Sequence, residues 1–103
     1  MSKIIRAVWK DQTIAEADEK DLIYIEGNWY FPPESVESRF LRESPTPYTC
    51  FWKGPCQYFD VGQEDNWDQD SAWTYRELKP GAIHRVKKDF SNYVAFWRQV
   101  KVA

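Results

Sequence analysis

The 103-residue sequence predicts one small, mainly β domain, antiparallel and with one short helix, that spans residues 1–103. Two observations carry this prediction. Short runs of alternating apolar and polar residues recur along the chain, and this is the period of a half-buried strand. These runs are separated by glycine, proline, asparagine and aspartate, which favour turns, and only one stretch has clear helical spacing. A chain of this length can build one modest hydrophobic core.

The first third of the chain is expected to form antiparallel strands. Over residues 3–10, Ile5, Ala7 and Trp9 fall on one face of an extended chain, while the polar residues between them fall on the other. Further strands are expected at 13–17, 22–25 and 29–31, after a turn at 11–12, a charged corner at 18–21 and a turn at 27–28.

Residues 33–41 are predicted to form the one helix, about three turns long. Pro33 suits the first helical position, and two glutamates follow near the positive end of the helix dipole. Val36 and Phe40 lie four positions apart, on the same helix face. Two prolines within 44–47 should end the helix, because proline cannot continue the hydrogen-bond ladder. We expect this helix to lie on the sheet as a lid.

Strand signals return in the second half of the chain. The predicted strands are 48–52, 57–61, 72–77, 93–97 and 99–102. Gly54-Pro55 predicts a turn between the first two, and the polar stretch 62–71 predicts a loop. A break is expected at 79–81, the stretch 83–90 is ambiguous, and 89–92 is expected to form a turn.

Composition limits the classes of partner. Charged residues make up 29% of the chain, and the net charge of −2 comes with basic and acidic residues interleaved throughout. Clustered cations are needed to bind nucleic acid or an anionic membrane, so neither partner is predicted. The sequence shows no signal-peptide pattern, and two cysteines are too few for a disulfide scaffold, which together favour a cytoplasmic protein with reduced thiols.

Residues 48–75 are the most informative segment for function. They contain eight of the eighteen aromatic residues, both cysteines, and a lysine in a Trp-Lys-Gly-Pro turn. Rings converging on a cavity select cations or flat heterocycles, and a lysine among them adds a charge. The predicted ligand-binding residues are Thr49, Cys50, Trp52, Lys53, Tyr58, Trp73 and Tyr75.

Each of these features also has a purely structural interpretation. Lys53 could bind an anion or stack on a ring, or it could belong to a solvated turn. Cys50 could be a nucleophile activated by Lys53, but a free cysteine is more often simply buried. Alternating rings could form cross-strand core pairs without any cavity.

No cofactor or metal is predicted. Two cysteines and the single histidine, His84, lack the spacing of a structural zinc site. Asp68 and Asp70 have the Asp-x-Asp spacing that holds magnesium in nucleotidyltransferases, but no glycine-rich phosphate loop precedes them. An acidic loop is also the usual composition of a solvated loop.

Several blocks of the sequence resemble a bacterial family. They are Tyr-Phe-Pro-Pro-Glu-Ser-Val at 30–36, Thr-Cys-Phe-Trp-Lys-Gly at 49–54, Tyr58, Ala-Trp-Thr-Tyr at 72–75 and Asn-Tyr-Val-Ala-Phe-Trp at 92–97. In order and spacing, these blocks resemble the domain of unknown function 427 family, which is also catalogued as nucleotidyltransferase-like. The resemblance covers nearly the whole chain and implies an all-β fold with a short helix, similar to the β-tent group of zinc-binding and ligand-binding domains, in a β-tent-like or barrel-like arrangement.

The chain departs from these relatives in two ways. It lacks the two Cys-x-x-Cys pairs with which the β-tent group holds zinc, and Cys56 stands where a small residue is expected. The leading hypothesis is a small-molecule-binding module with an aromatic pocket and a central lysine. The alternatives are a nucleotidyl- or acyl-transfer enzyme with Lys53 or Cys50 as the reactive group, and a protein-interaction domain.

Overall fold

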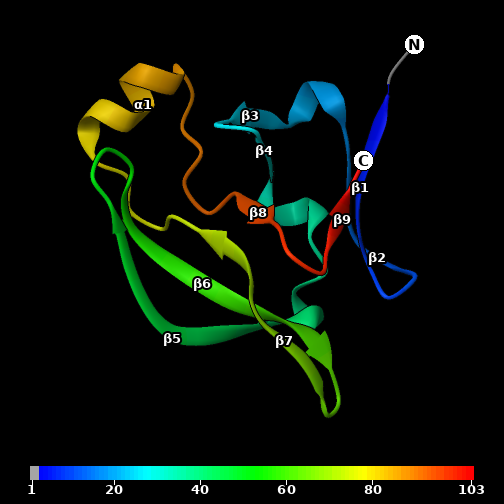
Figure 1. Cartoon of the computed structure of the whole chain (residues 1–103). Helices are drawn as coiled ribbons and strands as arrows, with labels where there is room; N and C mark the ends of the chain where they lie inside the picture. Colours follow the sequence, from blue (N-terminus) through cyan, green and yellow to red (C-terminus); the bar gives the residue numbers. More distant parts are fainter. Residues whose placement is uncertain (1–2) are drawn as a thin grey trace.

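The computed structural model describes residues 3–103 and contains two antiparallel sheets (Figure 1). The smaller sheet has the strand order β2-β1-β9, and the larger has the order β3-β4-β8-β7-β6-β5. The strands are β1 (Ile4–Trp9), β2 (Gln12–Asp18), β3 (Ile23–Ile25), β4 (Asn28–Phe31), β5 (Leu41–Cys50), β6 (Gly54–Gln63), β7 (Asn66–Thr74), β8 (Val94–Phe96) and β9 (Lys101–Val102). A mainly β fold with one short α-helix in the described chain confirms the predicted fold class.

The helical segments are short. The α-helix is α1 (Pro80–Val86), and three single turns of 3₁₀-helix are η1 (Glu19–Asp21), η2 (Pro33–Ser35) and η3 (Ser38–Phe40). Figure 1 shows α1 beside the turn that joins the long strands β5 and β6, away from the small sheet. No helix in residues 3–103 has the length and apolar character needed to cross a membrane.

The predicted helix over 33–41 is wrong. The segment forms η2 and η3 instead, because its backbone bonds to strand β2. Val36 makes an isolated antiparallel bridge with Ala15, and the Glu37 amide donates to the Ile14 carbonyl at 2.8 Å. An amide committed to another strand cannot also continue a helical ladder.

Strand β5 occupies the proline-rich stretch that was expected to end the helix. The two prolines are tolerated because β5 lies at the edge of the sheet, where a missing amide leaves no inner neighbour unpaired. Its register against β6 is irregular between Glu43 and Pro47. The turn expected at Gly54-Pro55 lies earlier, because both residues already pair with β5 as the start of β6.

The loop predicted over 62–71 is also wrong. Strands β6 and β7 form a long hairpin whose turn contains Glu64, with φ +51°, and Gln63 pairs with Asn66. The stretch is polar because much of the hairpin near this turn faces solvent. The segment is nevertheless extended because β6 and β7 pair with each other as far as Gln63 and Asn66. The composition of one segment does not reveal such pairing.

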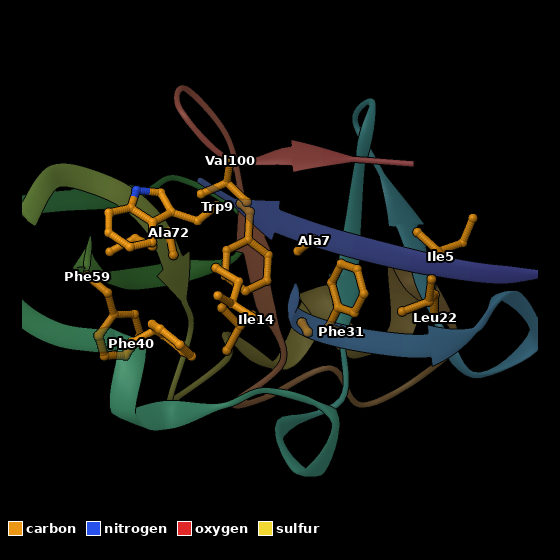
Figure 2. Packing of buried hydrophobic residues seen from close by; sticks show 14 residues of the cluster. Ile5, Ala7, Trp9, Ile14, Leu22, Phe31, Phe40, Phe59, Ala72 and Val100 are labelled. Atoms are coloured by element: carbon orange, nitrogen blue, oxygen red, sulfur yellow. The ribbon is translucent and has the colours of Figure 1, made fainter. Parts of the chain in front are cut away.

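The main hydrophobic core lies between the two sheets (Figure 2). Trp9 from β1, Ile14 from β2 and Phe31 from β4 are each at most 1% exposed. Figure 2 shows these side chains converging between the strands, with Phe40 and Phe59 completing one end. This packing holds one face of the large sheet against the small sheet and leaves the other face for a second cluster.

Candidate functional site

One row of residues crosses the face of the large sheet that lies opposite the main core. Tyr30 pairs with Ala95, Ala95 pairs with Trp73, and Trp73 pairs with Tyr58. Directly paired residues of antiparallel strands point to the same face, so these four side chains share one surface. Ala95 occupies little space between two large rings, and the Trp73 Nε1 donates to the Tyr30 hydroxyl at 3.1 Å.

A cavity of about 330 Å³ lies over this row, within the size range of small-ligand sites. Its lining is Glu26, Asn28, Tyr30, Tyr48, Lys53, Tyr58, Trp73, Tyr75 and Trp97. Six of these nine residues are tyrosine or tryptophan, which combine a flat apolar face with one polar group. The cavity therefore offers ring surfaces with hydrogen-bonding atoms at their edges.

The rings form a connected wall. Tyr58 and Trp97 lie nearly parallel, with an interplanar angle of 8° and ring centroids 6.3 Å apart. Trp97 meets Trp73 edge to face at 5.0 Å, and Tyr48 lies 6.3 Å from Tyr58. Trp97 is 37% exposed and Trp73 only 7%, so the wall runs from solvent into the protein.

The turn between β5 and β6 positions Lys53. Gly54 has φ +123°, and a Cβ atom at this position would lie 2.8 Å from the Glu77 carbonyl oxygen. The Lys79 amide donates to the Lys53 carbonyl at 2.9 Å. Because glycine has no Cβ atom, only glycine at position 54 allows the chain after β7 to approach the β5–β6 turn this closely. The close approach holds the turn in a conformation that leaves Lys53 only 5% exposed.

The buried ammonium of Lys53 has one carboxylate partner and two ring partners. Its Nζ forms an ion pair with Glu26, from the turn between β3 and β4. It also lies over the rings of Trp52, at 4.7 Å, and Tyr75, at 5.4 Å. The hydrogen bond from Lys53 is the main reason that the pKa of Glu26 lies below its ordinary value. The pair joins two turns at one end of the cavity.

The Trp52 ring contacts two cations. Besides Lys53, the Arg85 guanidinium of α1 lies over this ring at 4.4 Å. Trp52 therefore supports Lys53 and does not line the cavity itself. This contact also explains how α1 is held against the β5–β6 turn.

Burial keeps the tyrosine hydroxyls and the Cys56 thiol of this face in their neutral forms. Desolvation raises the pKa of Tyr30, Tyr58 and Tyr75 above that of an ordinary phenol. It also raises the pKa of the Cys56 thiol to about 11. At neutral pH these groups are hydrogen-bonding groups and not anions or nucleophiles.

The structure brings most of the predicted site residues together. Lys53, Tyr58, Trp73 and Tyr75 line the cavity, and Cys50 is buried in the same cluster. Thr49 is exposed on β5, where the alternation of strand side chains places it on the other face from its neighbours Tyr48 and Cys50. It does not line this cavity, and its hydrogen bond to a ligand stays a prediction.

Asp70 is a residue of this region whose place sequence reasoning missed. The sequence places it in a solvated acidic loop, but it lies in β7 with only 7% of its surface exposed. Its Oδ1 atom is buried without a hydrogen-bond partner. The Trp97 indole donates to its carbonyl oxygen, which links Asp70 to the ring wall. No local sequence signal marks it, because its burial depends on how β6, β7 and the end of β8 meet.

Metal ligands do not gather in the described structure. Within residues 3–103, no group of three or more histidine, cysteine, aspartate or glutamate side chains is placed to hold a metal ion. Asp68, the other half of the Asp-x-Asp pair, instead accepts a hydrogen bond from the Trp9 indole of β1 at 2.7 Å. The two free thiols, Cys50 and Cys56, lie in the aromatic cluster.

A larger cavity, about 470 Å³, lies on the opposite face of the large sheet. Its wall includes Val36, Leu41 and Phe59, and its charged residues Glu43 and Arg76 form an ion pair with each other at 2.9 Å. It continues the main core toward solvent and has fewer polar groups than the aromatic cavity. Its size would make it a candidate ligand site, but the aromatic cavity is the better candidate because its rings and polar groups can both contact a ligand.

Fold and site together define a class: a small antiparallel β domain with an aromatic-walled cavity and a buried lysine ion pair. The whole chain, residues 1–103, matches the family model described as Domain of unknown function (DUF427), and the protein belongs to this family. A comparison with curated proteins gives no match.

Proposed function

We propose that the protein is a cytoplasmic small-molecule-binding domain whose ligand occupies the aromatic cavity. The observation that carries this proposal is the row of paired residues under a cavity of about 330 Å³, with ring faces as its wall. Phenylalanine would fill such a face equally well, whereas tyrosine and tryptophan add polar groups that a ligand can use. Lys53 supplies a positive charge at one end, and the hydroxyl of Tyr58 supplies a hydrogen bond.

Binding is better supported than catalysis. A covalent mechanism needs a nucleophile beside a base, and the described cavity wall contains neither a cysteine nor a histidine. Lys53 is occupied by Glu26, and the raised pKa of Cys56 disfavours its thiolate. His84 is exposed on α1. The transfer-enzyme hypothesis therefore rests on a rearrangement at Lys53 or Cys50 that a ligand would have to drive.

A protein-interaction role has one specific observation in its favour. Phe51 is 83% exposed at the β5–β6 turn, and Tyr48, three residues earlier on β5, is 51% exposed. Aromatic side chains are enriched in protein–protein interfaces. Concentration-dependent association in sedimentation that Phe51→Ser abolishes would support this role.

The binding proposal is tested by a thermal-shift screen with planar aromatic compounds, quaternary amines, small acids and nucleotides, each with and without Mg²⁺. A ligand at a hundred times its Kd adds about 2.7 kcal/mol of stability, which raises the Tm of a domain this size by several degrees. We expect a metal-independent hit that the variant Trp97→Ala loses.

Trp67→Ala is the matched control. Trp67 lies on β7 but does not line the cavity, and its ring contacts Arg42 at 4.4 Å. A hit lost equally in both variants would contradict the proposed location. A hit that needs both Mg²⁺ and a phosphate group would favour the transfer enzyme, and no hit in the whole panel would contradict the small-molecule proposal.

A further inference from the structure

We propose that the ligand of the aromatic cavity is a planar ring with a carboxylate, that Lys53 binds this carboxylate, and that Glu26 occupies its place until the ligand arrives. This inference rests on the proposed function, because it names the ligand class of the same site. It stands on the unequal burial of the two ion-pair partners, on the groups that surround the Glu26 carboxylate, and on the turn that carries Glu26.

Lys53 and Glu26 differ greatly in burial. The Lys53 side chain is 6% exposed, and the Glu26 side chain is 56% exposed. Burying an ammonium without a counter-charge is costly, so Lys53 needs a carboxylate beside it. Glu26 does not need Lys53 in the same way, because water reaches its side chain. The place beside Lys53 therefore requires a carboxylate, and a ligand can supply it as well as Glu26 does.

The ion pair belongs to the wall of the cavity. Lys53 and Glu26 are the two charged residues among the nine that line it. Burial is the main reason that the pKa of Tyr30 lies above its ordinary value, and the negative charge of Glu26 adds to this effect. The Glu26 carboxylate is thus close enough to act on a tyrosine of the row under the cavity. A ligand carboxylate in the same place would bring its ring to that row.

The groups that surround the Glu26 carboxylate belong to other elements. The hydrogen bond from Lys53 is the main cause of its lowered pKa, and a hydrogen bond from the Trp52 side chain and the positive charge of Arg85 add to it. Lys53 and Trp52 lie in the β5–β6 turn, and Arg85 lies on α1. These groups stay in place when Glu26 moves away. They would likewise lower the pKa of a ligand carboxyl group and keep it anionic.

The turn between β3 and β4 allows Glu26 to leave. Ile25 pairs with Asn28, so Glu26 and Gly27 form a two-residue turn, and their φ values of +51° and +85° are both positive. Such a turn fixes the backbone but not the side chain. No atom lies within 4 Å of the place of a Cβ atom at Gly27, so open space adjoins the turn. Rotation of the Glu26 side chain into water therefore needs no change in the sheet.

The exchange of carboxylates favours an anionic ligand over the alternatives. One carboxylate replaces another at Lys53, so the charge pairing is kept, and the ring of the ligand gains apolar contact with the wall. A neutral ring gains the same contact but no charged hydrogen bond. A cationic ring would draw Glu26 away from Lys53 and leave the buried ammonium without a counter-charge.

The test uses three probes of the same shape: benzoate, which is anionic, benzamide, which is neutral, and benzamidine, which is cationic. Isothermal titration calorimetry with the unmodified protein at constant ionic strength should give the order benzoate, benzamide, benzamidine from tightest to weakest. This comparison requires no substitution, so it does not depend on whether a variant folds.

Two variants separate the roles of the partners. Glu26→Gln should bind benzoate at least about tenfold more tightly than the unmodified protein, because no internal carboxylate competes for the buried ammonium. Its affinity for benzamide should stay the same. Lys53→Met keeps a long unbranched side chain and should remove the preference for benzoate over benzamide. The Tm of each variant shows that it is folded.

Glu16→Gln is the matched control. Glu16 also forms an ion pair, with Arg6 at 2.6 Å, but it lies on β2 of the small sheet and both side chains are half exposed. The same substitution therefore removes the same charge from a cation that water can solvate. It should leave all three affinities unchanged.

The results that would overturn the inference are distinguishable. Equal binding of the three probes, or preference for benzamidine, would reject the anionic ligand class and leave an aromatic binding site. A benzoate preference that survives Lys53→Met would reject Lys53 as its partner. An unchanged benzoate affinity in Glu26→Gln would reject the exchange with Glu26. If no probe binds, the inference is contradicted, while the thermal-shift screen with Trp97→Ala decides separately whether the cavity binds another class of ligand.

Discussion

The two faces of the large sheet are built from neighbouring residues of the same strands, yet they differ in chemistry. On β4, Phe31 faces the main core while Tyr30 faces the cavity; on β6, Phe59 faces the core while Tyr58 faces the cavity. At these positions the core face carries phenylalanine, and the small sheet packs on that face. The cavity face carries tyrosine, whose hydroxyl can donate and accept hydrogen bonds. On β4 and β6, the hydroxyl of the ring therefore distinguishes the cavity face from the face that packs in the main core.

The two faces are also stabilised differently. Where the small sheet covers the core face, Phe31 and Phe96 are buried and meet edge to face at 5.6 Å, and their rings need no hydrogen bonds. On the cavity face, buried polar atoms must find partners, as Trp73 does at the Tyr30 hydroxyl. The first face should determine stability, and the second should determine binding.

The largest predicted effect is on the core face. Phe31 is fully buried, so Phe31→Ala should lower the free energy of unfolding by about 3–5 kcal/mol. The loss comes from the buried ring surface that is removed and from the closed cavity that remains in its place. Tyr58→Ala should cost less than half as much, because its site opens on the cavity and solvent can enter. Chemical denaturation of both variants measures the difference, and equal losses would break the distinction between the faces.

The second prediction concerns the thiol reactivity of the cavity face. The pKa of Cys56 is raised from 9.0 to about 11 by burial, so its thiolate at pH 8 should be about a hundredfold scarcer than that of an ordinary thiol. In the variant Cys50→Ala, which leaves one cysteine, alkylation by iodoacetamide should be slower than in denaturant by at least this factor. Similar rates in the native and unfolded protein would show that this face is open to water.

The third prediction compares the two halves of the Lys53–Glu26 pair. Glu26→Gln leaves a buried ammonium without its counter-charge and should cost about 1–2 kcal/mol, less than for a fully buried pair because Glu26 is half exposed. Lys53→Met removes the buried charge and leaves a glutamate that water can solvate, so stability should change by less than about 1 kcal/mol. Denaturant melts of both variants measure this asymmetry, and the reverse order would contradict the burial of Lys53.

The smallest effect is the pH dependence that Glu26 contributes. Its pKa is lower in the folded protein than the ordinary value of 4.5, so its contribution to stability is complete above that value. The contribution is lost as the pH falls from 4.5 through the folded-state pKa. A series of thermal melts across this range should show a shallower loss of stability for Glu26→Gln than for the unmodified protein. Parallel curves would show that the ion pair does not form in solution.

Sequence reasoning succeeded where one strand carries its own signal. The alternation of Ile5, Ala7 and Trp9 predicted β1 because one face of this strand is buried against the large sheet. The same reasoning failed at η2 and η3, where bonding to β2 replaces the expected helix. It also failed across the β6–β7 hairpin, where pairing overrides a polar composition.

The part of the candidate site that carries a local sequence signal could also be predicted. Lys53 and Trp73 belong to the aromatic-rich segment, which the composition alone singles out. Tyr30 and Trp97 join the cavity because β8 lies between β4 and β7 in the sheet, and this order is not visible in any local pattern. Asp70 depends on a bulge, which requires the register of two strands to be known.

The most direct test of the central claim is an NMR titration that follows the indole N–H signals of the six tryptophans while a ligand found in the thermal-shift screen is added. The account predicts that the signals of Trp73 and Trp97 shift saturably, while that of Trp9, in the main core, stays in place. Shifts of Trp9 without shifts of Trp73 and Trp97, or no saturable shift of any indole, would contradict a binding site on the aromatic face.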